Sequence, residues 1–101
     1  YIYNHWSNGR LEFRNESCNG RTFQAMQAAA ESDPELADRV EFFTHRVPEE
    51  LYHFGEDPDA LQNRIDDPDC AERLQIFRKH TAKWMRETDD ILHHCYKHND
   101  K

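Results

Sequence analysis

The sequence lacks any long apolar run and is poor in apolar residues overall. No stretch reaches the roughly 18 apolar residues of a membrane-spanning helix, so we expect no membrane span. Apolar residues make up 37% of the chain, below the usual ~45–50%, and charged residues make up 33%, above the usual ~25%. The length of 101 residues fits one domain, residues 1–101, with a thin core and a charged surface.

The sequence also has fewer basic residues than acidic ones. Thirteen Lys and Arg residues stand against twenty Asp and Glu, which gives a formal net charge of −7. Nucleic-acid binding depends on basic side chains that displace counterions from phosphates, so we expect no nucleic-acid partner. Direct capture of a sulfated polysaccharide by this surface is disfavoured for the same electrostatic reason.

Cysteine is scarce, and its spacing excludes the common cysteine motifs. Cys18, Cys70 and Cys95 form no C-x-x-C pair, which argues against a zinc ribbon or a thioredoxin-like site. We favour partly buried thiols, with a disulfide as the alternative. A nucleophilic role for Cys18 or Cys70 would need a neighbouring His and an orienting acid, and neither cysteine has a local signature for this.

No complete metal-binding motif is present. The acidic stretches 56–59 and 66–69 lack the alternating pattern of an EF-hand loop, and Asp followed by Pro is typical of a helix start. His94 and His98 are four residues apart and would share a helix face, but no third ligand is fixed nearby, so a solvated terminus is preferred. We therefore expect no metal site.

Three segments have the pattern of β-strands. Residues 1–6 are rich in aromatic and branched side chains, and residues 10–15 alternate apolar with polar side chains. Asn8-Gly9 between them is a strong hairpin signal, because both turn positions need positive φ. Residues 50–54 are the third strand candidate.

Three segments have helical periodicity. They cover residues 22–31, 34–45 and 68–88. Asp33-Pro34 and Asp67-Pro68 mark the starts of the second and third, because Asp is a good N-cap and Pro fits the first helical position. The pattern predicts an α+β fold, in which a small antiparallel sheet is packed by helices.

Two segments resemble the C-terminal part of sulfatases. Residues 48–63, with Glu50-Leu51-Tyr52 running into Asp57-Pro58 and then Asn63, resemble the C-terminal sulfatase signature. Residues 67–90, which contain Lys83-Trp84 followed by Glu87-Thr88, are similar to the closing helix of the heparan N-sulfatase (sulfamidase) branch. The structural signature residues are Glu50, Leu51, Tyr52, Asp57, Pro58, Asn63, Asp67, Pro68 and Trp84.

The resemblance covers nearly the whole chain and is strongest over residues 48–90. The N-terminal part, with Asn15-Glu16-Ser17 and Gly20-Arg21-Thr22-Phe23, is similar to bacterial members of that branch. Three positions depart from the usual signature: His53 stands where Asp is common, Ala60 where Glu is common, and Arg64 where Leu usually follows the Asn.

The resemblance implies a C-terminal fragment of a larger sulfatase that hydrolyses sulfuric esters or N-sulfo groups. In that family a formylglycine and a calcium ion lie in the catalytic domain, and no catalytic residue and no cofactor are expected in this chain. The implied partners of the subdomain and its parent are the parent's own catalytic domain and a sulfated glycan. The implied localisation is periplasmic, extracellular or lysosomal. The abrupt start at Tyr1-Ile2-Tyr3 is consistent with a fragment.

Polar residues near the expected hairpin are the candidates for contact with substrate. Arg14, Asn15 and Arg21 carry groups able to meet a sulfated sugar, so we expect them near the substrate pocket of the parent enzyme. The alternative function is a small acidic module that binds a protein through an exposed sheet edge. Bare edges and apolar surface also predict self-association of the isolated chain.

Overall fold

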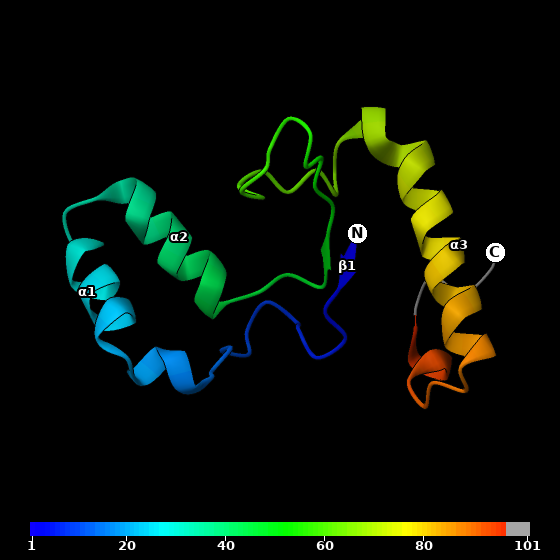
Figure 1. Cartoon of the computed structure of the whole chain (residues 1–101), viewed down its shortest axis with the longest axis horizontal. Coiled ribbons are helices and arrows are strands. Elements are labelled where there is room, and N and C mark those ends of the chain that lie inside the picture. The colour runs from blue at the N-terminus through cyan, green and yellow to red at the C-terminus, as the bar shows by residue number, and fades with distance from the viewer. Residues whose placement is uncertain (97–101) are drawn as a thin grey trace. The chain divides into compact units, whose positions relative to one another are not determined.

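The computed structural model describes residues 1–96 and has the predicted α+β class (Figure 1). Two compact units are present. The sheet unit comprises Tyr1–His5 and the chain from Glu49 onward, and the insert unit is Trp6–Pro48. The elements in chain order are β1 Ile2–Tyr3, the 3₁₀ turn η1 Glu16–Asn19, α1 Arg21–Ala29, α2 Pro34–Thr44, β2 Glu49–Glu50, η2 Pro68–Cys70, α3 Ala71–Glu87 and η3 His93–Cys95.

The sheet is smaller than expected and is paired differently. β1 lies antiparallel to β2, with Ile2 opposite Glu50 and Tyr3 opposite Glu49. The prediction of a strand over residues 10–15 that pairs with residues 1–6 is therefore wrong. The predicted strands 1–6 and 50–54 are reduced to two residues each.

A local turn built by the Asn8 side chain forms at Asn8-Gly9, but the predicted hairpin turn does not, because Gly9 has a positive φ and Asn8 does not. The Asn8 side chain accepts hydrogen bonds at 2.9 Å from the backbone N–H groups of Arg10 and Leu11, and Gly9 has a φ of 77°. Beyond the turn, Phe13 N–H donates to the Thr44 carbonyl at the end of α2, at 2.7 Å. The tendency to turn at these residues is local and could be predicted from the sequence. The strand that pairs with β1 is instead determined by contacts between residues distant in sequence.

The three helices match the predictions to within two residues at each end, counting η2 and α3 together. Asp33 caps α2 by accepting from Glu35 N–H at 3.1 Å and Leu36 N–H at 3.2 Å, and Pro34 takes the first helical position. Asp67 accepts from Asp69 N–H at 2.9 Å and opens η2, which leads directly into α3. Asp33-Pro34 and Asp67-Pro68 therefore cap helices, as the sequence predicted. The same prediction for the stretch 56–59 is wrong, because no helix starts at Asp57-Pro58 in the described chain.

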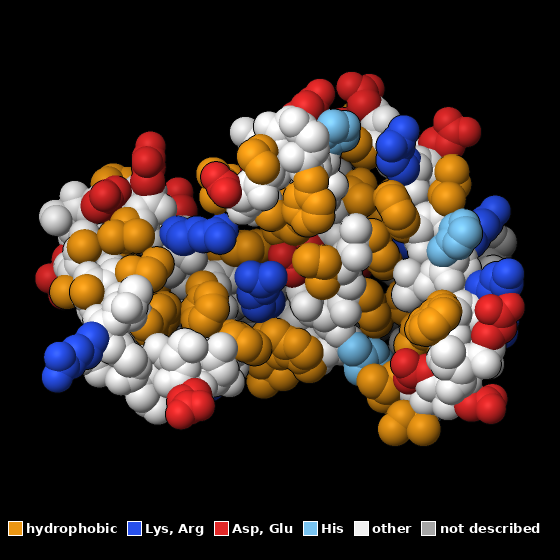
Figure 2. All heavy atoms as spheres, viewed as in Figure 1, with side chains coloured by type: hydrophobic (Ala, Val, Ile, Leu, Met, Phe, Trp, Pro, Cys, Tyr) orange, Lys and Arg blue, Asp and Glu red, His pale blue; other side chains and the backbone are white. Residues whose placement is uncertain are grey.

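The sheet unit has a small apolar core. Ala82 and Met85 of α3 pack with Tyr96, and Tyr3 lies against them with its ring at 4.7 Å from Tyr96 in an edge-to-face contact. Leu51 and Leu74 are also buried. The buried stripe of α3 is limited to Leu74, Ala82 and Met85, whereas Trp84 is 67% exposed and Phe77 is 39% exposed. Figure 2 shows hydrophobic side chains left on the surface over α3.

The insert unit is held by aromatic contacts without a buried apolar core. Phe43 of α2 contacts Phe13 edge-to-face at 5.4 Å and Phe23 of α1 at 5.2 Å, and Trp6 lies 5.7 Å from Phe13. Neither α1 nor α2 contains a buried residue. These rings therefore remain partly in contact with solvent.

A polar network joins β2 to α3 and to both ends of the described chain. Arg78 of α3 donates to both oxygens of the Glu49 carboxylate, through Nη2 to Oε1 at 2.8 Å and through Nε to Oε2 at 2.9 Å. The Tyr1 hydroxyl donates to Glu49 Oε2 at 2.7 Å and lies 2.9 Å from the Tyr96 hydroxyl. Because a hydroxyl carries a single hydrogen, Tyr96 then donates to Tyr1.

Burial decides the protonation of this network. It raises the pKa of the Tyr1 phenol well above its usual value, and the hydrogen bonds with Tyr96 and Glu49 raise it further. Burial also raises the pKa of Tyr96, and the Glu49 carboxylate raises the pKa of Arg78. Both phenols therefore stay neutral donors beside an ion pair whose side chains are 17% and 12% exposed.

Replacing Arg78 with Met should lower the free energy of unfolding by about 2–3 kcal/mol, because it leaves the Glu49 carboxylate without its charged donor. Chemical denaturation followed by circular dichroism measures the loss. Lys79→Met is the matched control on an exposed position of the same helix, and its effect should stay within about 0.5 kcal/mol. Equal effects of the two changes would show that the ion pair contributes nothing of its own.

Candidate functional site

Residues 48–63 form the signature segment, named for its resemblance to the C-terminal part of sulfatases, and side chains that bond to the backbone hold it together. Asp57 is buried, and its two carboxylate oxygens accept from the N–H groups of Leu61 and Gln62, each at 2.9 Å. These two bonds hold the pKa of Asp57 below its usual value, and the positive charge of Arg64 lowers it further. Ala60, with a φ of 52°, closes the turn that brings the two N–H groups to Asp57.

Asn63 extends the short sheet by imitating a neighbouring strand. Its side-chain amide donates to the Glu49 carbonyl at 3.2 Å and accepts from Leu51 N–H at 2.9 Å. The same oxygen accepts from Ile65 N–H at 3.1 Å, and Arg64 N–H donates to the Leu51 carbonyl at 2.7 Å. Asn63 therefore bridges this loop through its side-chain amide.

Glu50 is a fully buried carboxylate supported by neutral donors. Its Oε1 accepts from the Tyr52 hydroxyl at 2.7 Å, and its Oε2 accepts from the side-chain amide of Asn4. Leu51, the next residue, points into the core and is 4% exposed. The signature residues Glu50, Leu51, Tyr52, Asp57 and Asn63 therefore act on the fold of this segment.

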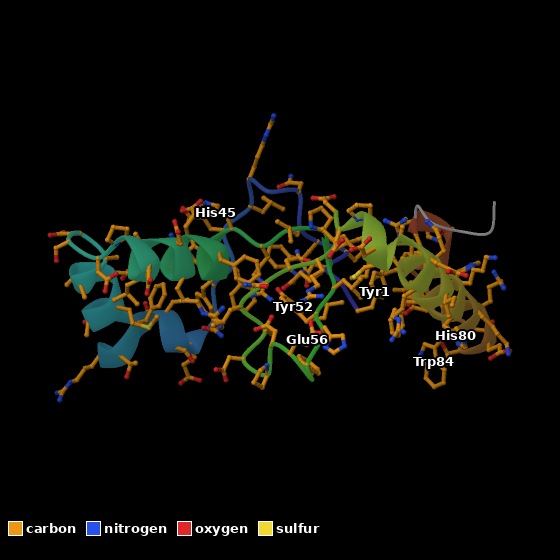
Figure 3. All side chains as sticks on the ribbon, turned by 90° about the horizontal axis from the view of Figure 1, so that it is seen from above. Tyr1, His45, Tyr52, Glu56, His80 and Trp84 are labelled. Carbon is orange, nitrogen blue, oxygen red and sulfur yellow. The ribbon has the colours of Figure 1, made fainter. Side chains whose placement is uncertain are left out.

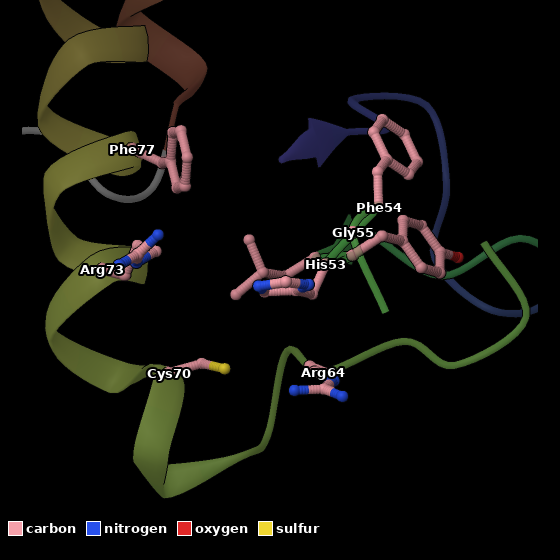
Figure 4. Close-up of a pocket in the computed structure, with 9 residues that line it drawn as sticks. His53, Phe54, Gly55, Arg64, Cys70, Arg73 and Phe77 are labelled. Atoms are coloured by element: carbon pink, nitrogen blue, oxygen red, sulfur yellow. The ribbon is translucent and has the colours of Figure 1, made fainter. Parts of the chain in front are cut away.

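A cavity of about 220 Å³ lies between the signature segment and the start of α3. Figure 4 shows His53, Phe54 and Arg64 from the loop on one side, and Cys70, Arg73 and Phe77 on the other. Arg64 forms an ion pair with Glu56 at 2.8 Å. The sequence did not predict this cavity, because its two arginines come from different elements and form no motif.

A second cavity, of about 260 Å³, lies in the insert unit and contains two of the three predicted substrate-contacting residues. Arg14 and Asn15 both line it, whereas Arg21, the first residue of α1, does not. Arg14 forms an exposed ion pair with Glu12 at 3.0 Å. The remaining lining residues are Glu12, Phe13, Cys18, Asn19, Phe23, Gln27 and Thr44.

Asn15 has a structural task in this cavity as well. It precedes η1, where the Cys18 thiol donates to its side-chain oxygen and its own N–H donates to the Cys18 sulfur, both at 3.4 Å. Cys18, Cys70 and Cys95 are all free thiols, and only Cys95 is exposed, so the disulfide alternative is not realised here.

Both cavities are smaller than the usual ~300–1,000 Å³ of a pocket that encloses a small molecule. Within residues 1–96 no group of three or more His, Cys, Asp and Glu side chains is arranged to hold a metal ion. His98, one of the two histidines considered as a metal pair, lies outside the described residues. No helix in the described part of the chain combines the length and the apolar character needed to cross a membrane.

Comparison with known proteins gives no relative from which a function could be transferred to this chain. No protein-family model, no curated protein and no solved structure matches it. Function must therefore be argued from the residues and their geometry.

Replacing Asp57 with Asn should destabilise the protein at neutral pH, because the amide offers one acceptor oxygen where two N–H groups need partners. The folded-state pKa of Asp57 is lowered, so its stabilisation is complete above the unfolded-state pKa of about 3.9 and is lost as pH falls through the lower folded-state value. Denaturation midpoints measured from pH 7 to pH 3 should fall less steeply for the variant. Asp59→Asn, at an exposed neighbouring position, is the control and should follow the unmodified protein. Parallel curves for D57N and the unmodified protein would contradict this role.

Proposed function

We propose that this chain is the C-terminal subdomain of a sulfatase-family hydrolase, closest to the heparan N-sulfatase branch. It scaffolds the catalytic domain of the parent protein and shapes the substrate pocket. The observation that carries the proposal is the set of hydrogen bonds that the signature residues make. Asp57 and Asn63 bond to the backbone of the signature segment, and the buried Glu50 accepts from the Tyr52 hydroxyl within it, so these residues support the fold of the segment.

The uncovered apolar surface supports a scaffolding role. The insert unit packs its aromatic rings without burying any residue of α1 or α2, and the sheet unit leaves Phe54 67% and Leu61 65% exposed. Apolar groups gathered on a surface mark regions that pack against another protein part. A catalytic domain of the same polypeptide is the partner that the resemblance implies.

The chemistry of the parent would reside outside this chain. The formylglycine precursor in sulfatases is a Cys or Ser followed by Pro two residues on and Arg four residues on. Cys18 is followed at those positions by Gly20 and Thr22, and Cys70 by Glu72 and Leu74. These residues do not fit the formylglycine motif, and the described residues do not fit a calcium site. We assign no catalytic residue to this chain.

The alternative, a module that binds proteins through a sheet edge, has less support. Edge pairing needs a row of free backbone groups along a strand, and β1 and β2 are two residues long each. We therefore retain the scaffolding proposal.

The proposed function predicts that the full-length gene product hydrolyses N-sulfoglucosamine or a sulfate ester and that this chain alone hydrolyses neither. The assay compares both proteins on N-sulfoglucosamine and on a generic aryl sulfate. An active parent with an inactive fragment supports the proposal, and the preferred substrate identifies the branch. Activity of the fragment, or a parent inactive on both substrates, would contradict it.

In the full-length protein, Arg14→Ala and Arg21→Ala should raise the KM for the sulfated substrate roughly tenfold or more, because each would remove a charged donor from the sulfated sugar. Steady-state kinetics measures this, and kcat should change less than KM. Arg39→Ala, at an exposed position of α2, is the matched control. Since Arg14 lines the insert-unit cavity and Arg21 does not, an effect of Arg14→Ala alone would place the substrate at that cavity. Unchanged KM in both variants would remove these residues from the pocket.

A further inference from the structure

Helix α3 carries a stripe of exposed side chains. Its buried side carries Leu74, Ala82 and Met85, whereas Ile76 is 52% and Trp84 67% exposed. Around Trp84, the exposed positions recur at the spacings of four and three that form a single stripe on a helix. This outer stripe consists of Arg73, which also lines the cavity beside the signature segment, and of Ile76, His80, Trp84 and Glu87. Figure 3 shows His80 and Trp84 together on one side of the helix.

The outer stripe is complementary to the same stripe of a second copy that lies antiparallel to it. His80 lies at its middle, and Arg73 and Glu87 lie seven residues before and after it, at about 10.5 Å along the axis for a rise of about 1.5 Å per residue. Ile76 and Trp84 lie four residues before and after it, at about 6 Å. A second helix laid antiparallel about a twofold axis at His80 therefore sets Arg73 against Glu87 and Ile76 against Trp84, twice over.

The contacts within one chain leave these groups available. In residues 1–96 no ion pair is formed by Arg73, and Glu87 makes an exposed contact of 3.5 Å with Lys83, both side chains being at least 60% exposed. Exposed pairs of this kind contribute little, about 0–1 kcal/mol.

We propose that α3 pairs with α3 of a second copy of this chain, antiparallel and about a twofold axis at His80. The interface is isologous, so one patch serves both partners, and the Arg73–Glu87 pairs fix the direction and register. The apolar contribution comes from Ile76 and Trp84, and a large exposed aromatic side chain is the kind of residue that dominates such interfaces. This pairing goes beyond the proposed function and does not depend on it.

The area involved sets the strength of the association. One helix face on each side falls short of the ~1,200–2,000 Å² buried in a stable interface, so the dimer is weak and concentration-dependent. It should be populated toward millimolar protein and lost on dilution.

Sedimentation equilibrium on this chain, from about 10 µM to about 1 mM at low salt, tests the pairing. The mean mass should rise with concentration from 12.1 kDa toward twice that value. Trp84→Ala should keep the mass at that of a monomer throughout, because it removes the principal apolar contact at both ends of the interface. Gln75→Ala, at an exposed position on another face of α3, should dimerise like the unmodified chain. Circular dichroism confirms that each variant is folded.

A charge reversal tests the register independently. Arg73→Glu and Glu87→Arg should each weaken the dimer, because each sets like charges opposite one another. The double variant should restore association, since the pairs are reformed with their signs exchanged. A chain that stays monomeric at 1 mM, a dimer that survives Trp84→Ala, or single and double charge variants that behave alike would overturn the proposal. Sulfatase activity is not a readout in these experiments, so the pairing can fail while the proposed function stands.

Discussion

The Glu49 carboxylate is the point on which the sheet unit depends. It receives two bonds from Arg78 and one from Tyr1, and Tyr96 reaches it through Tyr1. One carboxylate therefore connects β2, α3 and residues 95 positions apart. The few buried apolar side chains lie around this network, so the apolar contacts and the ion pair reinforce one another: burial strengthens the ion pair, and the ion pair fixes α3 against the strand. An ion pair of this kind specifies an arrangement more than it adds stability, because the desolvation of both partners offsets much of their attraction.

Side chains also complete the secondary structure that the backbone leaves short. A sheet of two two-residue strands satisfies few backbone groups, and Asn63 supplies the partners that a third strand would have given to Glu49 and Leu51. Asp57 does the same for the turn that follows, where a carboxylate takes two N–H groups that have no strand to pair with. Buried backbone groups must be paired, and here the pairing is achieved by two specific residues. The contacts therefore give Asp57 and Asn63 a physical role in the fold of this segment.

The sequence anticipated what local chemistry controls and missed what distant contacts control. The starts of α2 and η2 follow from Asp33-Pro34 and Asp67-Pro68. The hairpin was mispredicted because the Asn8-Gly9 signal says nothing about which strand will be the partner of β1, and that partner lies more than forty residues downstream. The spacing of Tyr1, Glu49, Arg78 and Tyr96 in the sequence does not predict their network. For the candidate site, the sequence placed Arg14 and Asn15 in one neighbourhood but could not tell that Arg21 lies outside the cavity, since that depends on the three-dimensional path of the chain.

The distribution of apolar surface explains why both inferred roles of this chain are roles of association. Within residues 1–96, the sheet unit buries only Leu51, Leu74, Ala82, Met85 and Tyr96 among its apolar side chains, and no residue of α1 or α2 is buried. Conformational entropy opposes folding in proportion to chain length, so a chain with so small a core has little free energy to spare. A partner that binds only the folded form adds stability by mass action. Covering of the insert unit by a catalytic domain and pairing of the outer stripe of α3 with a second copy would each supply such a contribution. They would act on different surfaces, since the outer stripe belongs to the sheet unit.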